Sequence, residues 1–157
     1  MTESVAVLDI FVEAGGRSID TADVYSAWVP GNSGADSETS IGQWLAARCR
    51  RDDVVIATRG CALESRLRLS AANICAAVDE SPRPLHTDSI DLYYAHRDDD
   101  VIAQDEYVAA FGALAAEGKV REVGASNVMA ESWVLSSRRW SSSASSSFCT
   151  RRSRADS

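Results

Sequence analysis

The chain lacks an apolar run approaching the ~20 residues that a membrane-spanning helix needs. Its first residues, MTESVAVLDIF, also lack the basic start and apolar centre of a signal peptide, so we expect a cytoplasmic protein without membrane contact. Basic residues are in the minority, because 16 Lys and Arg stand against 23 Asp and Glu, and the formal net charge is -7. Since phosphate binding needs a basic surface, this balance argues against nucleic acid as a partner.

Metal-ligand patterns are missing as well. The cysteines have no CxxC spacing and no histidine placed to complete a zinc site, so we expect reduced, partly buried thiols and no metal. Asp98, Asp99 and Asp100 lack the glycine and glutamate of a calcium loop, and we interpret them as a solvated turn. The letters HRD from His96 to Asp98 match a kinase catalytic loop, but the glycine-rich loop and strand lysine of a kinase are absent.

The hydrophobic pattern indicates strands that alternate with helices. The chain is 45% hydrophobic and 25% charged, which is usual for a globular protein and argues against a wholly disordered one. Asp36 and Ser37 are predicted to cap one of the helices. We expect helices starting near Val5, Asp36, Ser70 and Asp105, and strands around Ile19 and over 54–58, 89–96 and 120–127. Such alternation is typical of parallel βαβ units.

Two stretches interrupt this alternation. Pro82 and Pro84 are predicted to cut short the helix that begins at Ser70, because proline removes a backbone donor and clashes with the preceding turn. Residues 136–157 are rich in Ser and Arg and have no period, so we expect a disordered tail. The abrupt loss of pattern after Leu135 suggests translation in a shifted reading frame, a hypothesis that the other frames of the nucleotide sequence would test.

Polar residues gather where each predicted strand ends. The segments are IDTADVY, ATRG, YYAHRDD and GASN, in chain order. In an α/β barrel the C-terminal strand ends face the active site, so we expect these clusters to converge on one pocket. Taken singly, Asp20, His96 or Ser126 would be explained more simply as a turn, strand-end or helix-capping residue. Their order on successive strands favours a site.

The segment from Asp20 to Tyr25, DTADVY, resembles the D-T-A-x-x-Y motif of the aldo-keto reductase superfamily. Matches continue in order from about Leu8 to Asn127, which is most of the chain. The resemblance implies an α/β fold, a partial (β/α)8 TIM barrel of about four parallel βα units. It places an NADP-dependent oxidoreductase domain at residues 1–135.

The resemblance also implies roles for the polar residues. Tyr25 would donate a proton to the substrate carbonyl, Asp20 would pair with a nearby cation, and His96 would orient the carbonyl. Ser126 and Asn127 match the family pair that hydrogen-bonds the nicotinamide carboxamide, and together with Asp20 they would hold the ring. NADPH is therefore the expected cofactor, and an aldehyde or ketone, reduced to an alcohol, is the expected substrate.

Arg59 departs from the family, which has a lysine after the corresponding strand. A free phenol has a pKa of about 10, so Tyr25 depends on a neighbouring cation to act as an acid near neutral pH. Arginine keeps the charge and can pair with Asp20, but it cannot readily surrender a proton, and its planar fork is bulkier than an ammonium group. We therefore expect impaired or absent turnover.

The chain is shorter than the ~250 residues that a closed barrel typically needs. The resemblance implies a member truncated at both ends, without the late-strand positions that grip the phosphates of the cofactor. A half barrel leaves open strand edges, through which we expect self-association. Two alternatives to a working reductase stay open: a non-catalytic nucleotide-binding or interaction module, and an inert truncated or frameshifted product.

Overall fold

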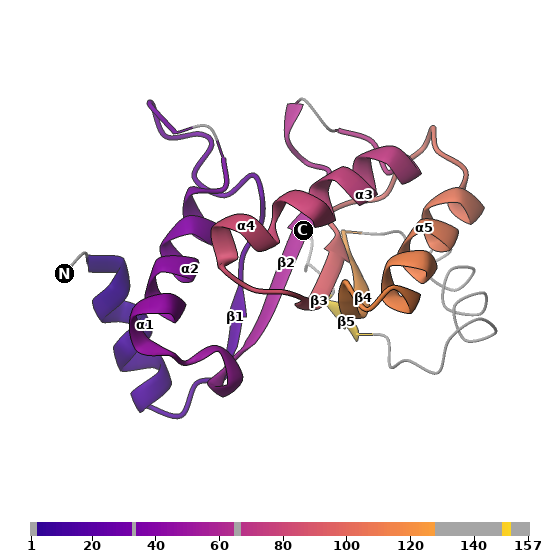
Figure 1. Ribbon diagram of the computed structural model, residues 1–157. Helices are drawn as coiled ribbons and strands as arrows, with labels where there is room; N and C mark the ends of the chain where they lie inside the picture. The colour runs from indigo at the N-terminus through magenta and orange to yellow at the C-terminus, as the bar shows by residue number, and fades with distance from the viewer. Residues whose placement is uncertain (1–2, 33, 65–66, 128–148, 152–157) are drawn as a thin grey trace.

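Helices and strands alternate along the computed structural model, which describes residues 3–32, 34–64, 67–127 and 149–151 (Figure 1). The strands are β1 (Ser18–Asp20), β2 (Val55–Gly60), β3 (Ile90–Ala95), β4 (Val120–Ser126) and β5 (Cys149–Arg151). The helices are α1 (Glu3–Glu13), α2 (Asp36–Arg48), α3 (Ala71–Glu80), α4 (Pro82–Leu85) and α5 (Gln104–Ala116), with a 3-10 turn at Arg51–Asp53. Within these ranges, no helix is long and apolar enough to span a membrane.

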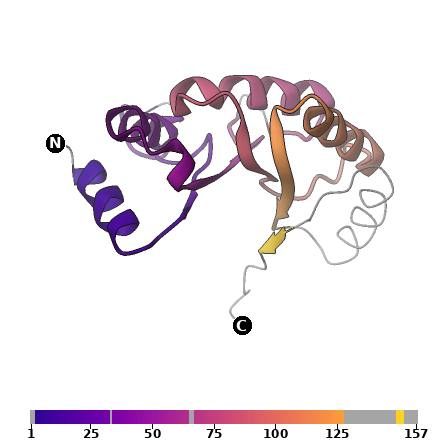
Figure 2. The same cartoon turned by 60° about the horizontal axis from the view of Figure 1, so that its bottom comes forward.

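All strand pairs are parallel, and their order in the sheet follows the chain, β1-β2-β3-β4-β5. Helices α2, α4, α3 and α5 form an arc over one face of the curved sheet, and α1 lies beside the β1 end (Figure 2). Sequential order with helices on a single face is the arrangement of a βα barrel wall, because each right-handed crossover places its helix on the same side. The predicted α/β fold and its partial barrel are confirmed.

Two clusters of buried apolar side chains join the helices to the sheet. One lies under β3 and β4 and includes Ile74, Tyr93, Phe111, Leu114 and Val123. The other lies under β1 and β2 and includes Val12, Ile19, Trp44, Ile56 and Leu85. The second cluster contains Ile56 of β2, and the first contains Cys61, which directly follows β2, so the two clusters pack the helices along the whole sheet.

The prolines end α3 as predicted, whereas the residues predicted to cap α2 do not cap it. Helix α3 ends at Glu80, but Pro82 begins a further helical turn, α4, since the first position of a helix needs no backbone donor. Helix α2 is preceded by Ala35 in the left-handed region, at φ 59°, without a side-chain cap. Asp36 and Ser37 are therefore not caps, because they lie inside the first turn, where Ser37 contacts the strand side instead.

The predicted tail, residues 136–157, lies outside the described residues except for Cys149–Arg151. These three residues form β5, which pairs in parallel with β4 from Gly124 to Ser126. They are the part of the predicted tail for which the structure describes an element. Backbone pairing depends on the N–H and C=O groups that an edge strand offers, and it can occur without any side-chain period.

Candidate active site

Asp20 and Tyr25 lie where the chain leaves β1. The backbone N–H of Thr21 donates to the Ala57 carbonyl over 2.8 Å, and that of Asp23 donates to the Arg59 carbonyl over 3.0 Å, so pairing with β2 continues past the end of β1. The chain then turns, and the Tyr25 hydroxyl donates to Asp20 Oδ2 over 3.3 Å. The spacing of the DTADVY segment thus brings the phenol back over the carboxylate.

Arg59 connects the strands at this end of the sheet. Its side chain is only 8% exposed, and it forms an ion pair with Asp20. One guanidinium nitrogen, Nη1, also donates to Ser126 Oγ over 3.5 Å. The guanidinium carbon lies 5.8 Å from the centroid of the Tyr25 ring and 5.3 Å from that of Tyr94. The cation is therefore held between aromatic faces and a carboxylate, an arrangement suited to guanidinium.

His96 follows β3 and faces Tyr25 edge-on, with ring centroids 6.4 Å apart and an interplanar angle of 85°. Its backbone carbonyl accepts a hydrogen bond from Asn127 Nδ2 over 3.1 Å. The same amide nitrogen lies 3.3 Å from Ser126 Oγ. Asn127 has φ 56°, in the left-handed region that asparagine tolerates better than most residues. This turn at the end of β4 brings its amide against the β3 loop.

The protonation of His96 is set by its surroundings. Burial is the largest cause that lowers the pKa of His96, and the positive charges of Arg59 and Arg97 lower it further, against the opposing effect of Asp20. The imidazole is therefore neutral near pH 7. Its Nδ1 atom is buried and has no hydrogen-bond partner among the described residues. A neutral imidazole can both donate and accept, so it can bind a carbonyl oxygen.

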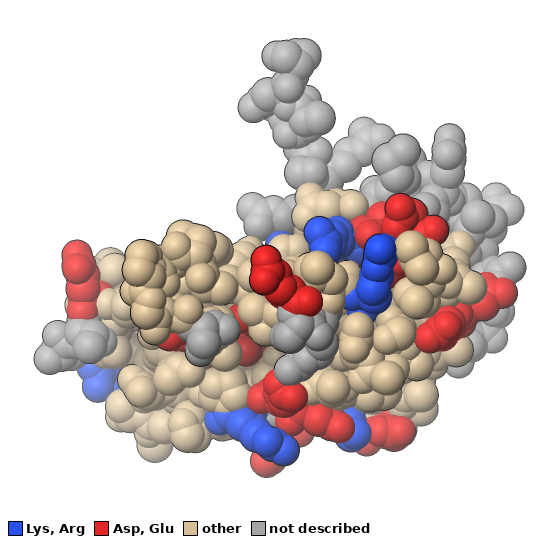
Figure 3. Space-filling view, turned by 90° about the horizontal axis from the view of Figure 1, so that it is seen from above, with Lys and Arg blue, Asp and Glu red and all other residues tan. Residues whose placement is uncertain are grey.

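The sequence predicted that Asp20, Tyr25, Arg59, His96 and the Ser126–Asn127 pair would meet, and the structure brings them to one end of the sheet. Their assigned roles stay predictions. Figure 3 looks down from the top of Figure 1 onto the loops that follow the strands. On that face, small groups of acidic and basic side chains alternate. Tyr94, which lies against the Arg59 guanidinium, was not predicted to belong to the site. Only one residue, Ala95, separates it from His96, and this spacing was the signal in the sequence.

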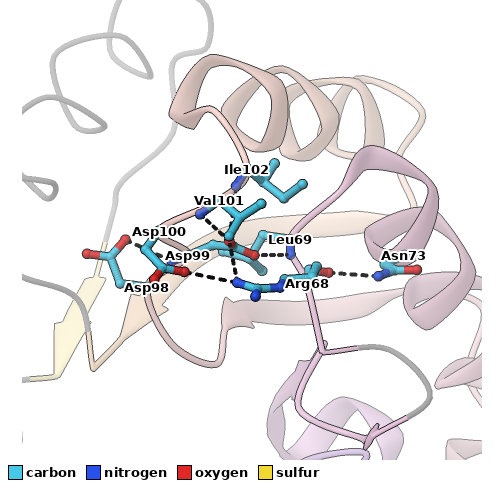
Figure 4. A network of polar contacts seen from close by, with 8 residues as sticks. All are labelled: Arg68, Leu69, Asn73, Asp98, Asp99, Asp100, Val101 and Ile102. Carbon is cyan, nitrogen blue, oxygen red and sulfur yellow. Dashed lines mark hydrogen bonds and ion pairs between the residues drawn. The ribbon is translucent and has the colours of Figure 1, made fainter.

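Asp99 was interpreted as part of a solvated turn, and this was wrong, because its side chain is only 3% exposed. Its carboxylate accepts hydrogen bonds from the backbone N–H groups of Leu69, Val101 and Ile102 over 2.8 to 3.0 Å (Figure 4). Arg68 forms ion pairs with both Asp99 and the exposed Asp100. The carboxylate therefore ties the loop after β2 to the loop after β3.

Hydrogen bonds also set the charge of Asp99. Burial alone would raise the pKa of Asp99, but the backbone donors and the Arg68 charge outweigh it, and the pKa lies below its ordinary value. Sequence reasoning could not find the link between the two loops, since it depends on the Leu69 donor, thirty residues away in the chain. The described part of the chain contains no cluster of three or more metal-ligating side chains.

Comparison with known proteins agrees with this geometry. Residues 1–140 match the model of the aldo/keto reductase family, and the chain belongs to that family. It is 36% identical over 141 residues to norsolorinic acid reductase B of Aspergillus parasiticus. This match covers 83% of the chain and 35% of the length of that relative. It is 35% identical over 146 residues to an aryl-alcohol dehydrogenase [NADP(+)] of Phanerodontia chrysosporium, covering 85% of this chain and 36% of that protein.

A norsolorinic acid reductase of Emericella nidulans is similar to the same extent, at 35% identity over 140 residues. The match covers 83% of this chain and 34% of that protein. The chain thus spans about a third of the length of the curated relatives that it matches. Membership of an oxidoreductase family whose members reduce carbonyl groups is established, and the activity of the chain itself is a separate question.

Proposed function

We propose that this chain carries the substrate-facing part of an NADPH-dependent carbonyl reductase, and that Arg59 leaves its turnover impaired or absent. The observation that supports this most directly is the contact of Tyr25, Asp20, Arg59 and His96 at one end of the sheet. It combines a proton donor, a cation and a neutral imidazole in one place, which is what carbonyl reduction requires beyond the hydride source.

The residues present fit a nicotinamide. Arg59 Nε and His96 Nδ1 are buried atoms without a hydrogen-bond partner among the described residues, and such atoms suit a site that a polar group completes. Ser126 and Asn127 would hold the carboxamide, with Asp20 beside the ring. A relative carries NADP(+) in its name, which favours the phosphorylated cofactor here. When bound, the reduced nicotinamide supplies a hydride to the carbonyl carbon.

The side chains of the chain then handle the oxygen and its proton. The Tyr25 hydroxyl gives its proton to the carbonyl oxygen as the carbon–oxygen double bond becomes a single bond. Arg59 stabilises the phenolate that remains through its positive charge, because its guanidinium lies over the Tyr25 ring. His96 orients the carbonyl as a neutral hydrogen-bonding group. A guanidinium can supply charge but not a proton relay, so reprotonation of Tyr25 is the step that the substitution impairs.

Trp28 points to an aromatic substrate. The residue is 73% exposed, and its ring meets Tyr25 edge-on at 6.4 Å between centroids, so it offers an aryl ring a stacking surface beside the proton donor. The names of the relatives, aryl-alcohol dehydrogenase and norsolorinic acid reductase, favour the same class. Benzaldehyde is therefore the probe aldehyde of choice.

Titration of the purified chain with NADPH, followed by fluorescence, tests the proposal. Saturable binding with benzaldehyde turnover supports a reductase, and Arg59→Lys should then raise the rate while Tyr25→Phe abolishes it. Binding without turnover, even in Arg59→Lys, supports the non-catalytic module. Neither binding nor turnover supports the inert product and rejects the proposal for this chain.

We also propose that copies of the chain self-associate through β1. Among the described strands, β1 has only one neighbour, and the Arg17 carbonyl and Thr21 N–H bond to β2, so Ser18 and Asp20 direct their peptide groups to the open edge. Val7 and Ile10 of α1 are 60% and 66% exposed nearby. Light scattering should show dimers that Ser18→Pro dissociates and Ile19→Val does not. A monomer at high concentration would reject this.

A further inference from the structure

The first turn of α2 lies behind the candidate site and bonds to both of its leading strands. Thr21 Oγ1 donates to Ser37 Oγ over 2.8 Å, and Thr58 Oγ1 donates to Glu38 Oε1 over 2.6 Å. Thr21 directly follows Asp20, and Thr58 directly precedes Arg59. Successive side chains of a strand point to opposite faces of the sheet. Each threonine therefore bonds to α2 on the helix side, and its charged neighbour, Asp20 or Arg59, lies on the opposite face.

These contacts are fully enclosed. Thr21 and Thr58 are completely buried, and Glu38 is 1% exposed. The pKa of Glu38 is raised to about 7, mainly by burial and to a lesser extent by the charge of Asp23, against the hydrogen bonds from Thr58 and Ser81. The buried carboxyl is not part of the chemistry described above. Its removal would leave the Thr58 hydroxyl without an acceptor inside the protein, which costs more than losing a solvated contact.

The position of α2 does not depend on this turn. Further along the helix, Trp44 Nε1 donates to Asp9 Oδ1 over 2.8 Å, and Arg48 pairs with Asp9 over 2.8 Å. Gly42 lies so close to α4 that a Cβ there would collide with the Pro84 carbonyl. These contacts hold the helix in place, so the hydrogen bonds of its first turn are not needed to position it and act on the strands.

We propose that Ser37 and Glu38 are positioning residues that hold the ends of β1 and β2 and so fix Arg59 relative to Asp20 and His96. Glu38 acts through Thr58 on the backbone of Arg59, and Ser37 acts through Thr21 on that of Asp20. Neither side chain touches the reacting groups. Ser37 and Glu38 support the backbone of the site whether or not the chain turns over a substrate.

His96 reports on the place of Arg59. The Arg59 charge lowers the pKa of His96, so displacement of the guanidinium should raise that pKa toward its ordinary value. The chain has two histidines, and the other, His86, is exposed and follows α4. NMR titration of the imidazole carbons therefore gives a reading at the site and an internal control in the same sample, without cofactor or turnover.

The test compares Glu38→Ala with Glu38→Gln in the full chain. Glu38→Ala should raise the His96 midpoint and leave His86 unchanged, while Glu38→Gln should keep the wild-type midpoint, since its amide oxygen can still accept from Thr58. Arg59→Met sets the shift that complete loss of the cation produces. Thr58→Val, which preserves shape, should shift His96 as Glu38→Ala does and covers the case in which Glu38→Ala does not fold.

Two results would overturn the proposal. One is an unchanged His96 midpoint in folded Glu38→Ala or Thr58→Val. The other is an equal shift in Glu38→Gln and Glu38→Ala, which would mean that the charge of Glu38, and not its hydrogen bond to Thr58, acts on His96. Either outcome leaves the reductase proposal untouched, because the measurement reads protonation and not catalysis.

Discussion

A buried carboxyl group supports each half of the sheet near the candidate site, and the pKa values of the two carboxyls are shifted in opposite directions. Behind β1 and β2, Glu38 meets hydroxyl groups, and burial holds its pKa near 7, so it is largely neutral below that pH. At the β2 and β3 loops, Asp99 meets backbone N–H groups and Arg68, and its pKa lies below the ordinary value. The comparison shows that donors, more than burial, decide whether a buried carboxyl keeps its charge.

The helices of the two halves differ in a similar way. Helix α3 is capped by Ser70, whose hydroxyl accepts from the Asn73 N–H over 3.3 Å. Helix α2 has no side-chain cap, and its first turn is bonded to the strands instead. In the half that carries Arg59 and Tyr25, the polar side chains at the helix start therefore bond to the strands. In the other half, the polar side chain at the helix start caps its own helix.

The largest effect is expected from Asp99→Ala, which would remove the acceptor of the Leu69, Val101 and Ile102 N–H groups. We expect a loss of about 3–4 kcal/mol in the free energy of unfolding. Urea denaturation measures it. Asp100→Ala is the matched control, because Asp100 shares Arg68 but its side chain is 92% exposed, and its stability should match the wild type. Equal losses in both variants would contradict the assigned role of Asp99.

A slightly smaller effect should separate Glu38 from Asp99 by its pH dependence. The folded pKa of Glu38, about 7, exceeds the ordinary value of 4.5, so the folded chain binds this proton more tightly than the unfolded chain does. The stabilisation is full below pH 4.5 and is lost as the pH rises to 7. The stability difference between wild type and Glu38→Gln should change by about 3 kcal/mol over that range.

Denaturation at several pH values measures this difference, with Glu38→Gln as the reference that does not titrate. The Asp99 contribution should run the other way, being present at higher pH and lost as the pH falls through the lowered pKa. A Glu38 contribution that is constant from pH 4.5 to pH 7 would remove the contrast between the two carboxyls.

The smallest effect concerns the helix starts. Ser70→Ala should lower the free energy of unfolding by about 1 kcal/mol, because it removes the cap of α3. Ser40→Ala is the control in α2, where the hydroxyl bonds back to the Asp36 carbonyl within the helix and alanine is the better helix former. Thermal unfolding should separate the two, and a loss in Ser40→Ala as large as in Ser70→Ala would contradict the difference between the helices.

Much of the fold could be predicted from the sequence because it depends on short-range patterns. The β-branched run before Arg59 indicates a buried strand, and the spacing of Ile41, Trp44 and Leu45 indicates one face of a helix. The order of polar residues after successive strands was enough to predict that Asp20 and His96 lie close together, since the carboxyl ends of parallel strands meet at one edge of the sheet. Pro82 shows the limit, because a proline that ends one helix can start another.

The sequence by itself determined the alternation of strands and helices and the set of side chains at the end of the sheet, since both follow from local periodicity and chain order. Only the tertiary structure decided that Asp99 is buried, that Glu38 supports Thr58, and that Tyr94 lies against Arg59. Those facts depend on partners far apart in the chain, and the charge of a carboxyl depends on the donors that folding brings to it.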